Sequence, residues 1–522
     1  MKRLPLVLAL LVLACSADDE TLEPLDLAGP PAAIEAVGGE GQVGGSGTTL
    51  GQPLAVRVTD ADDKPVPGVD VTWTVERGTL SAGSAETNTD GVSEVSWTLP
   101  ATVGLDEARA SVEGAGSVAF TATVQPVSGT VVFRYLDAGG YHACGITTTE
   151  QLLCWGYGAD GQLGLGSTVP QTFPTLIPGD NRYRMITGGY YHSCAFTLAT
   201  AAYCWGNNSD GRLGNGSEAG RSDAPVEVLT AASVDTTVAD TIIGGGRIHI
   251  LVQDLDAGFA HSCAVDLSQH AYCWGRNSEG QVGRGALTPG EHITNATLVT
   301  TSQLFKVVTV GGLHSCGVTV DGDGLCWGYN VAGQLGDGST TTTPAPAPVA
   351  TGRFRTDPAV LFHSPDPDFP LPPGPFMAAG YDHTCGILES GGTVCWGLNE
   401  HGQLGDGTGT THSTPASVAG GHSFAAITAG LRHTCALDTS GAAWCWGDNR
   451  LGQLGDGTRD PSAVPVAVSG GLPFAYLKAG ELFTCGVTSA GVAWCWGDNE
   501  YGQLGDGTTI SSPTPLKVAF QP

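Results

Sequence analysis

Cysteine spacing is the strongest chemical signal in the chain. Fourteen of the fifteen cysteines fall into seven pairs whose members are ten residues apart. An even number of cysteines at one fixed spacing is typical of disulfides in exported proteins. If two cysteines face each other across an antiparallel hairpin, the nine residues between them suit two matched arms and a three-residue loop with a glycine bulge. We therefore predict seven hairpin disulfides: Cys144–Cys154, Cys194–Cys204, Cys263–Cys273, Cys316–Cys326, Cys385–Cys395, Cys435–Cys445 and Cys485–Cys495.

A histidine stands two residues before the first cysteine in six of the seven units. A ring of imidazoles could in principle hold a metal ion, because imidazole and thiolate are both zinc ligands. The seventh unit has Phe483 at this position, however, and disulfide-bonded cysteines do not ligate. We therefore expect these side chains to pack between repeats, with no metal and no cofactor. The six histidines are His142, His192, His261, His314, His383 and His433.

A tryptophan follows the second cysteine of every pair. Exposed tryptophans would offer stacking platforms for sugars, but recurrence at one position of each unit favours a packing contact between neighbouring units. The chain contains no nucleophile elbow, phosphate loop or zinc-protease motif, and spacing singles out no pair of carboxylates. We therefore predict that the protein is not an enzyme. The tryptophans are Trp155, Trp205, Trp274, Trp327, Trp396, Trp446 and Trp496.

Composition indicates what kind of elements hold these residues. The 522 residues include 78 glycines, 41% are hydrophobic and only 14% are charged, which excludes a disordered chain and favours many tight turns. An all-β fold follows from this composition. The formal net charge of −29 opposes binding to nucleic acid, because phosphates would be repelled.

A long repeat organises three quarters of the chain. The first cysteines of successive pairs are 50, 69, 53, 69, 50 and 50 residues apart, a period that fits one blade of a β-propeller. Each unit shows four strand-like runs: one such as Phe424–Ile427, two that contain the cysteines, and a proline-bounded one such as Val464–Val468.

The repeat resembles a known family. The segment AGLRHTCAL, continued by CWGDNRLGQLGDGT and together spanning residues 429–458, is similar to the regulator of chromosome condensation repeat. That resemblance implies a seven-bladed β-propeller over residues 127–522. Because the chain begins this region with the strand Val131–Leu136 and ends it with Pro515–Phe520, we expect the last strand to complete the sheet that the first begins.

The region before the repeats, residues 32–126, alternates apolar and polar residues between turns, as in a β-sandwich. The segments ADDKPVPGVDVTWTV and TNTDGVSEVSWTL resemble bacterial immunoglobulin-like domains of the invasin and intimin type. That resemblance implies an immunoglobulin-like domain that acts as a spacer or an adhesive module at a cell surface.

The amino terminus predicts export. Lys2 and Arg3 precede the apolar run Leu4–Leu13, which is too short to span a bilayer. Residues 12–15, Val-Leu-Ala-Cys, resemble a bacterial lipobox. This predicts a signal peptide over residues 1–14, a lipid anchor on Cys15 and an acidic tether over 15–31, hence a protein of the cell envelope, on the outer membrane or cell surface. An ordinary secretory signal is the alternative.

Two insertions interrupt the regular repeat, within residues 218–256 and 340–376. The first holds the apolar, strand-like piece Ile248–Val252. Long loops on a rigid ring are common binding sites, although tolerated surface insertions are the alternative. The candidate binding residues lie in the second insertion: Arg353, Phe354, Arg355, Phe362, His363 and Phe369.

We therefore expect a monomeric, envelope-anchored binding platform whose partner is a protein or an envelope glycan and whose only membrane contact is its lipid. An inhibitor of an exported enzyme is one alternative, because a secreted β-lactamase inhibitor shares the propeller family. A carbohydrate-active propeller enzyme is another. Guanine-nucleotide exchange, the activity of the eukaryotic namesake, is disfavoured by the export signal, the disulfides and the acidity.

Overall fold

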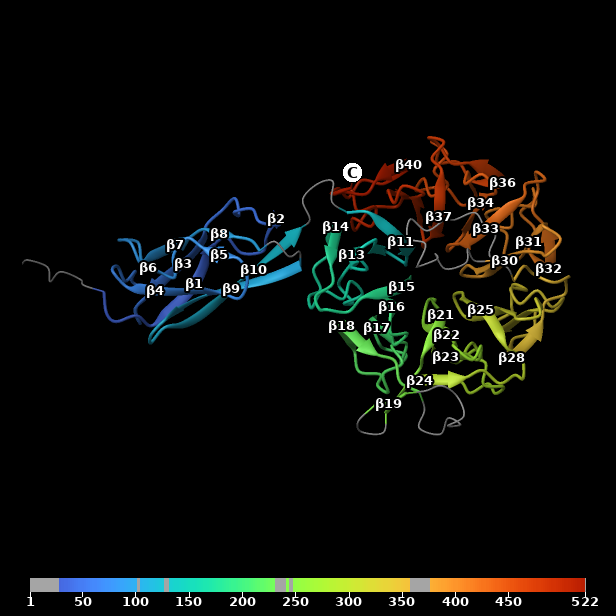
Figure 1. Ribbon diagram of the computed structural model, residues 1–522, viewed down its shortest axis with the longest axis horizontal. Helices are drawn as coiled ribbons and strands as arrows, with labels where there is room; N and C mark the ends of the chain where they lie inside the picture. Colours follow the sequence, from blue (N-terminus) through green and yellow to red (C-terminus); the bar gives the residue numbers. More distant parts are fainter. Residues whose placement is uncertain are drawn as a thin grey trace, which may run out of the picture. The chain divides into compact units, whose positions relative to one another are not determined.

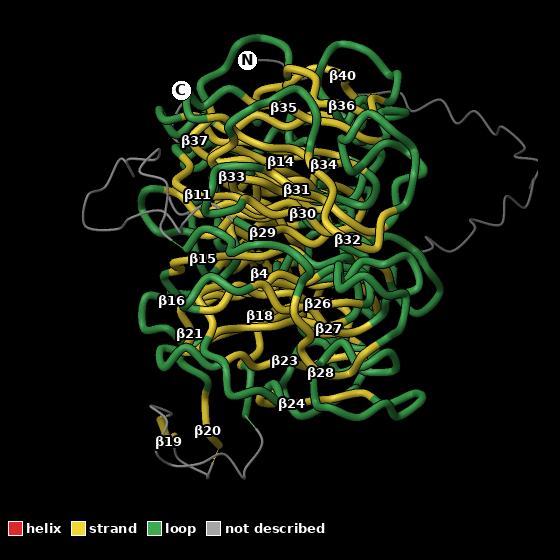
Figure 2. Tube along the Cα trace, turned by 90° about the vertical axis from the view of Figure 1, so that its right-hand side faces the viewer, coloured by secondary structure: helices red, strands yellow, loops and turns green. Residues whose placement is uncertain are grey.

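The computed structural model describes residues 28–100, 104–125, 131–230, 241–243, 247–356 and 376–521, and the described chain forms two compact units. Within these ranges the chain consists of strands and turns without any helix (Figure 2), so the all-β prediction is confirmed. It follows that this part of the chain has no helix long and apolar enough to cross a membrane. Cys15, Phe362, His363 and Phe369 lie outside the described residues.

The amino-terminal strands form three antiparallel groups, seen at the left of Figure 1. Burial alternates along β4, where Val71 and Trp73 point inward, and Trp73 lies 5.7 Å from Phe120 between ring centroids. One group is β1 (Ala33–Gly38), β3 (Leu54–Thr59) and β7 (Val92–Val95). A second is β2 (Gln42–Gly45), β10 (Gly116–Gln125), β9 (Gly104–Val112), β4 (Asp70–Val75) and β6 (Ser84–Glu86), and the third is β5 (Thr79–Leu80) with β8 (Trp97–Thr98).

The larger unit contains seven four-stranded sheets, each built from four consecutive strands. The first three are β11–β14 (Phe133–Ala138, His142–Thr147, Leu152–Gly156, Gln171–Leu176), β15–β18 (Tyr183–Gly188, His192–Thr197, Ala202–Asn207, Arg221–Glu227) and β21–β24 (Val252–Ala257, His261–Asp266, Ala271–Arg276, His292–Leu298). The next two are β25–β28 (Phe305–Val310, His314–Thr319, Gly324–Gly328, Thr343–Pro348) and β29–β32 (Met377–Ala379, His383–Ile387, Thr393–Gly397, His412–Ser417). The last two are β33–β36 (Phe424–Ala429, His433–Asp438, Ala443–Gly447, Ser462–Ala467) and β37–β40 (Phe474–Ala479, Phe483–Thr488, Ala493–Gly497, Ser512–Lys517).

These sheets follow one another around a ring, from cyan to red in Figure 1, and the first strand of each sheet faces the axis. The last sheet contacts the first through β37, β38 and β11, which closes the ring as a β-propeller. The predicted exchange of the final strand is wrong: β40 pairs with β39 of its own sheet. The chain ends meet instead through one main-chain bond, Val131 N to Phe520 O at 3.0 Å.

The cysteine hairpin has the predicted geometry. In the first sheet Cys144 is directly opposite Cys154, and Thr147 N donates to Gln151 O around a three-residue loop. The last loop residue has a positive φ, which glycine tolerates best. Four sheets have glycine there (Gly322, Gly391, Gly441, Gly491), and three have a residue with a side chain at φ 65–71° (Glu150, Thr200, Gln269).

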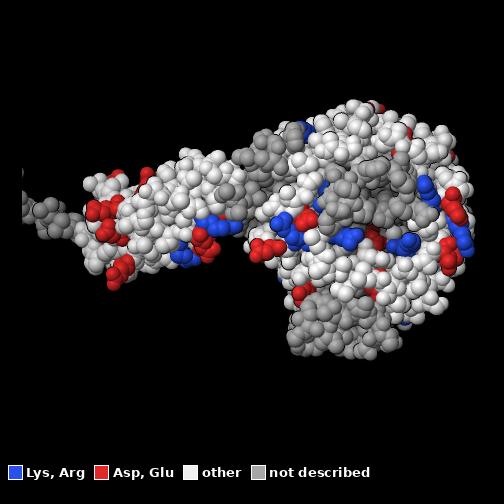
Figure 3. Space-filling model, in the orientation of Figure 1, with Lys and Arg blue, Asp and Glu red and all other residues white. Residues whose placement is uncertain are grey.

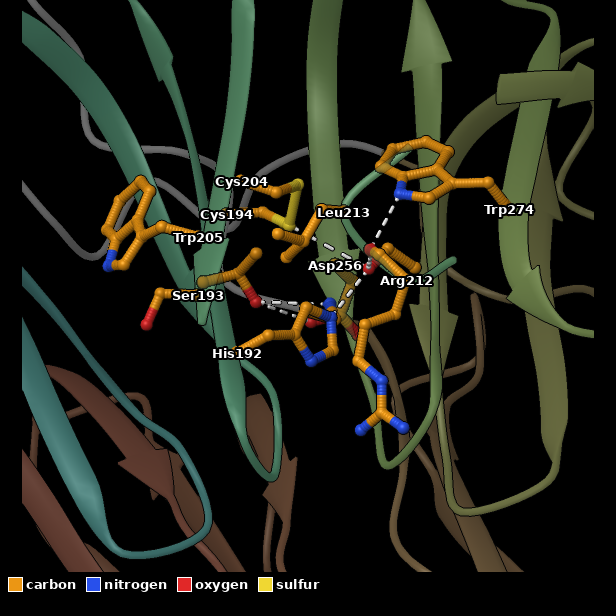
Figure 4. Close-up of a disulfide and its surroundings, with 12 residues drawn as sticks. His192, Ser193, Cys194, Cys204, Trp205, Arg212, Leu213, Asp256 and Trp274 are labelled. Atoms are coloured by element: carbon orange, nitrogen blue, oxygen red, sulfur yellow. Dashed lines mark hydrogen bonds between the residues drawn. A yellow bond between two sulfur atoms is a disulfide. The ribbon is translucent and has the colours of Figure 1, made fainter. Parts of the chain in front are cut away.

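A tryptophan and, in six of the seven sheets, a hydroxyl residue join each sheet to the preceding one. Trp205 donates its Nε1–H to Gln162 O of the preceding sheet, and the hydroxyl of Ser193 donates to the same carbonyl. The equivalent tryptophan bonds recur at all seven junctions at 2.8–3.0 Å, including Trp155 to Gln503 O across the closure. Figure 4 shows one such junction, where Trp274 reaches Arg212 beside the Cys194–Cys204 disulfide. Packing between repeats therefore accounts for every one of the seven tryptophans.

The first insertion differs in detail from its prediction. Residues Ile248–Val252 do not form one strand: β20 (Arg247–His249) pairs with β19 (Thr241–Ile243), whereas Val252 already begins β21. Between them, Ile250 is fully buried. The apolar piece is thus divided between a short hairpin and the propeller core.

Candidate functional site

The ring has two edges with different contents. Because successive strands alternate in direction, the connections from strands 1 to 2 and 3 to 4 of each sheet lie at one edge, here called the mouth edge. The cysteine hairpin loops and the connections from one sheet to the next lie at the other, here called the hairpin edge. Both insertions belong to connections between sheets, so they start and end at the hairpin edge.

The structure corrects the role predicted for Phe354. Its side chain is 1% exposed and its ring lies 6.1 Å from that of Trp396 between centroids. Phe354 N donates to Gly322 O, as Phe474 N donates to Gly441 O where β37 begins. Phe354 therefore starts the first strand of its sheet as a core residue, because its apolar ring packs against the tryptophan of the same sheet.

Its two neighbours are also part of this strand end. Arg353 Nε lies 3.6 Å from Asp323 Oδ1 with both side chains well exposed. Arg355 N donates to Ile387 O, its guanidinium lies 5.9 Å from the centre of the Phe376 ring, and the strand resumes where Ile387 N donates to Phe376 O. In the other sheets this place is a β-bulge, such as the one between Phe133 and Tyr135. The insertion thus enters at a bulge, where extra residues cost no ladder bond.

The histidines predicted to pack between repeats do so through hydrogen bonds. His142 Nε2 lies 2.7 Å from Ser193 Oγ of the next sheet. Since that hydroxyl donates its only proton to Gln162 O, the imidazole Nε2–H must be the donor. Five further histidines make the same contact at 2.8–2.9 Å. Burial lowers the pKa of His142 to about 3, so the ring is neutral. In the described chain no group of three or more His, Cys, Asp or Glu side chains is placed to hold a metal ion.

The cysteines form seven disulfides with S–S distances of 2.01–2.09 Å. Each bond lies inside one hairpin and is buried. The disulfides therefore stabilise single sheets and link no two sheets together.

A row of aromatic rings lies at the mouth edge. Tyr190 is at its centre, with its ring centroid 5.4 Å from that of Tyr141 and 4.7 Å from that of Phe259, and Phe259 is 5.6 Å from Tyr381. These four residues come from the connection between strands 1 and 2 of four different sheets. Each ring is half-buried, so apolar and hydroxyl surface remains accessible. Large, rigid aromatic side chains of this kind are typical of binding surfaces.

Close contact between turns fixes where these rings point. The seven turns are joined by a closed ring of main-chain bonds of 3.0–3.4 Å, in which Tyr190 N donates to Gly258 O and Glu481 N donates to Gly139 O. Glycine is required beside them: a Cβ on Gly430 would lie 2.2 Å from Gly480 O. The residue that follows each such glycine therefore lies at the mouth, and these residues are Gly140, Tyr190, Phe259, Gly312, Tyr381, Leu431 and Glu481.

A cavity of about 260 Å³ opens among these side chains. Burial raises the pKa of Glu481 to about 7, partly offset by hydrogen bonds from Tyr190 and Tyr141, and burial also raises the pKa of Asp382. Arg432 is the cation beside them. We call this cavity the mouth pocket; it is lined by Tyr190, Phe259, Tyr381, Asp382, Leu398, Leu431, Arg432 and Glu481.

Below the mouth, the axial channel has a volume of about 150 Å³ and is crossed by an ion pair. Lys478 Nζ lies 3.0 Å from Asp137 Oδ2 and 3.7 Å from Asp256 Oδ1. Burial alone would lower the pKa of Lys478, but the two carboxylates raise it well above its usual value. Burial raises the pKa of Asp137 to about 6, so both partners are charged at neutral pH.

The mouth residues were not among the binding residues predicted from sequence. A signal was present, because an aromatic residue stands three or four positions before the first cysteine in four units, at Tyr141, Tyr190, Phe259 and Tyr381. It was weak, since the aromatic position varies from repeat to repeat while the cysteine and histidine positions are regular. Variation at one face of a regular ring is what specific binding requires.

Comparisons with known proteins agree with this architecture. One model of the regulator of chromosome condensation (RCC1) repeat matches residues 150–196, 440–487 and 490–522. A second model of the same repeat matches residues 133–162, 252–281, 377–403, 424–453 and 475–503.

Curated relatives match part of the chain. The ultraviolet-B receptor UVR8 of Arabidopsis thaliana is 28% identical over 281 residues, which are 54% of this chain and 56% of the receptor. The probable E3 ubiquitin-protein ligase HERC4 of Homo sapiens is 28% identical over 177 residues, 32% of this chain and 14% of the ligase. The match thus spans about half of the plant receptor and a small part of the ligase.

Solved structures share the fold. Human WBSCR16 has a TM-score of 0.58 at 21% identity and covers 70% of this chain and 93% of its own. Prp20p from Saccharomyces cerevisiae has a TM-score of 0.59 at 19% identity, covering 72% and 87%. The two repeat models indicate that the propeller contains repeats of the regulator of chromosome condensation type, and the solved structures share its fold.

Proposed function

We propose that this protein is a non-enzymatic binding platform that holds a partner protein against the mouth edge of its propeller. The observation that carries the proposal is the row Tyr141, Tyr190, Phe259 and Tyr381, four half-buried rings presented by four separate sheets, of which the last three line one pocket. Aromatic anchors around a pocket contribute most of the binding energy in many protein interfaces.

We further propose that each of the seven sheets is one blade and that residues 32–126 form an immunoglobulin-like spacer. In this proposal Cys15 carries the lipid anchor, residues 15–31 are the tether, and the protein stands on the outer membrane or cell surface. Seven buried disulfides support an oxidising compartment, because such bonds persist there and are rare in the cytosol.

The mouth edge replaces the insertions as the first surface to test. Of the six residues expected to bind, Phe354 belongs to the core, and Arg353 and Arg355 flank it at the hairpin edge. A partner on the aromatic row would contact side chains from several sheets at once, and this favours a protein over a small molecule.

The experiment is affinity capture with oxidised residues 16–522 from envelope and secreted fractions. It compares the natural sequence with Tyr190→Ala plus Phe259→Ala, which removes the centre of the row. The matched control is Tyr203→Ala, a half-buried tyrosine of β17 that bonds to Glu227 away from the mouth. We expect a stoichiometric partner to be retained by the natural and control proteins and lost from the double variant.

Retention of the same partner by the double variant would refute the mouth edge as the binding surface. Saccharide hydrolysis abolished by one point mutation would refute the non-enzymatic proposal in favour of a carbohydrate-active propeller. Circular dichroism and thiol titration confirm that each variant is folded and oxidised before capture.

A further inference from the structure

The mouth pocket contains a carboxylate oxygen that the protein itself leaves unused. Glu481 Oε2 is buried, and it has no hydrogen-bond partner among the described residues. A buried acceptor without a donor lowers stability, and a donor brought by a ligand would offset that cost. The group that completes this oxygen should be a hydrogen-bond donor that arrives with a ligand.

Charge in the pocket favours a cation. Glu481 and Asp382 provide two acids against the single base Arg432, and Asp498 adds a further negative charge that acts on Glu481. Arg432 is already engaged, with Nη1 3.1 Å from His401 Nε2, and Asp382 accepts a bond from Gln334. Oε2 of Glu481 is therefore an acceptor without a partner near two further acids.

The walls of the pocket suit a cation as well. Three aromatic rings line the cavity, and those of Tyr190 and Phe259 meet at 66° while those of Phe259 and Tyr381 meet at 82°. A ring face attracts a cation, and the attraction is greater where water is excluded. Aromatic faces around a buried carboxylate form a site for an alkylammonium group.

We propose that the mouth pocket receives the side-chain ammonium of a lysine presented by a partner protein, an inference that rests on the proposed function. The aliphatic stem packs on Tyr190 and Phe259, and the ammonium donates to Glu481 Oε2. A compact ammonium suits one unpaired oxygen, whereas a guanidinium needs two parallel acceptors. The rings of Tyr141, Tyr157 and Tyr501 extend the contact beyond the pocket, so the surface suits a whole protein. The formal charge of −29 also attracts a basic partner.

The probe is Nα-acetyl-lysine methylamide, titrated calorimetrically at pH 8 into the oxidised protein, beside its Nε-acetylated form, the arginine analogue and choline. We expect the lysine probe to bind at least tenfold more tightly than the other three. Glu481→Gln should weaken it at least tenfold, whereas Glu500→Gln, which removes an exposed acid from the same edge, should leave affinity unchanged. Equal binding of the acetylated probe, or tighter binding of arginine or of choline, a headgroup mimic, would overturn the proposal.

A measurement on the natural sequence keeps the test independent of any variant. Because the Glu481 carboxyl must be ionised to accept the ammonium, affinity should rise about tenfold per pH unit below its pKa of about 7 and level off above it. The groups that face it are Tyr141, Tyr190, Asp498 and Arg432, together with Asp382 of the same pocket. Affinity that does not change between pH 5.5 and 8 would overturn the proposal.

Failure of this inference is distinguishable from failure of the proposed function. If partner capture is lost in the Tyr190→Ala plus Phe259→Ala variant but is unaffected by Glu481→Gln and by excess lysine probe, the binding-platform proposal is supported and the lysine-binding proposal is refuted. If the Tyr190→Ala plus Phe259→Ala variant retains the partner as well as the natural protein does, the binding-platform proposal is refuted. Displacement of the partner by the lysine probe supports both.

Discussion

Phe483 of the last sheet and Ala143 of the first lie at the junction between these two sheets. At the other six junctions these two positions hold a histidine and a hydroxyl residue. Phe483 and Ala143 are both fully buried. At the six other junctions the imidazole donates to the hydroxyl, which in turn donates to a main-chain carbonyl. The closure replaces both polar groups together, so neither is left buried without its partner.

This pairing predicts coupling between the two positions. Phe483→His alone places an imidazole Nε2–H opposite a methyl group and should lower the free energy of unfolding by about 1–3 kcal/mol, the cost of an unsatisfied buried donor. Adding Ala143→Ser supplies the acceptor and should recover a large part of the loss. Denaturant unfolding of the natural, single and double variants measures the coupling. Strictly additive effects of the two changes would contradict the pairing.

Acidification should destabilise the propeller between about pH 6.5 and 4. Burial lowers the pKa of His142, His261 and His314 to about 3, so the unfolded chain binds more protons than the folded chain below about 6.5, and stability falls as pH falls. Each such proton corresponds to about 1.4 kcal/mol per pH unit. His192, His383 and His433 act in the same direction.

Three carboxyls oppose this effect in part. The pKa values of Asp137, Asp254 and Glu481 are raised to about 6, 7 and 7, so they favour the folded chain as pH falls through the same range. Six histidines outnumber three carboxyls, and the net slope is therefore downward on acidification. Unfolding midpoints in denaturant from pH 8 to pH 4 measure it, and a midpoint that rises as pH falls would refute the assignment of neutral buried imidazoles.

Thr200→Gly should stabilise the second hairpin. Thr200 has a φ of 66°, a conformation that costs a β-branched residue about 1–2 kcal/mol and costs glycine almost nothing. We expect the free energy of unfolding to rise by up to about 1 kcal/mol, since glycine also gains entropy in the unfolded chain. The reverse change Gly441→Thr is the matched control and should destabilise; equal effects of both changes would argue against strain at this position.

Phe354→Ala distinguishes a core residue from a binding residue. Loss of this buried ring beside Trp396 should cost about 3–5 kcal/mol of unfolding free energy, whereas Arg353→Ala on the exposed side should cost less than about 0.5 kcal/mol. Thermal unfolding measures both variants. A Phe354→Ala protein of normal stability that had lost its partner would restore the original assignment of this residue to binding.

Lys478→Met should lower the free energy of unfolding, because it leaves the buried carboxylate of Asp137 in the axial channel without its counter-charge. Asp137 then keeps its burial without its counter-charge, and breaking such a pair costs about 3–5 kcal/mol. The deficit should shrink at pH 5, where Asp137 is protonated, and shrink again in the double variant with Asp137→Leu. A deficit that is the same at pH 5 and pH 8 would show that the carboxylate charge is not its cause.

The repeat was predictable because its residues act over short distances. The spacing of Cys435 and Cys445 determines the hairpin, and the glycine at Gly441 marks the loop position of positive φ, so fold class, hairpins and tryptophan packing followed from sequence. The way the ring closes could not be predicted from sequence, because the pattern of Pro515–Phe520 suits a strand that pairs with its own sheet and equally one that pairs with the first sheet.

The mouth pocket could not be predicted from sequence, for a different reason. Glu481 and Tyr190 are 291 residues apart, and only the closed ring of turns brings their side chains together. Phe354 was misjudged because its insertion begins inside a strand and not after one, which no local pattern reveals. Both errors concern contacts between sheets, where sequence distance carries little information.

Because each sheet is built from consecutive strands, the ring should tolerate circular permutation. Among the described residues no strand is shared between the first and last sheets of the ring, and Val131 N already lies 3.0 Å from Phe520 O. Joining these ends and opening the chain between any other two sheets would leave every hairpin, disulfide and junction in place. The chain of the ring could therefore begin at a different sheet. A circular permutant that starts at Phe305 or Phe424 should fold to the same ring.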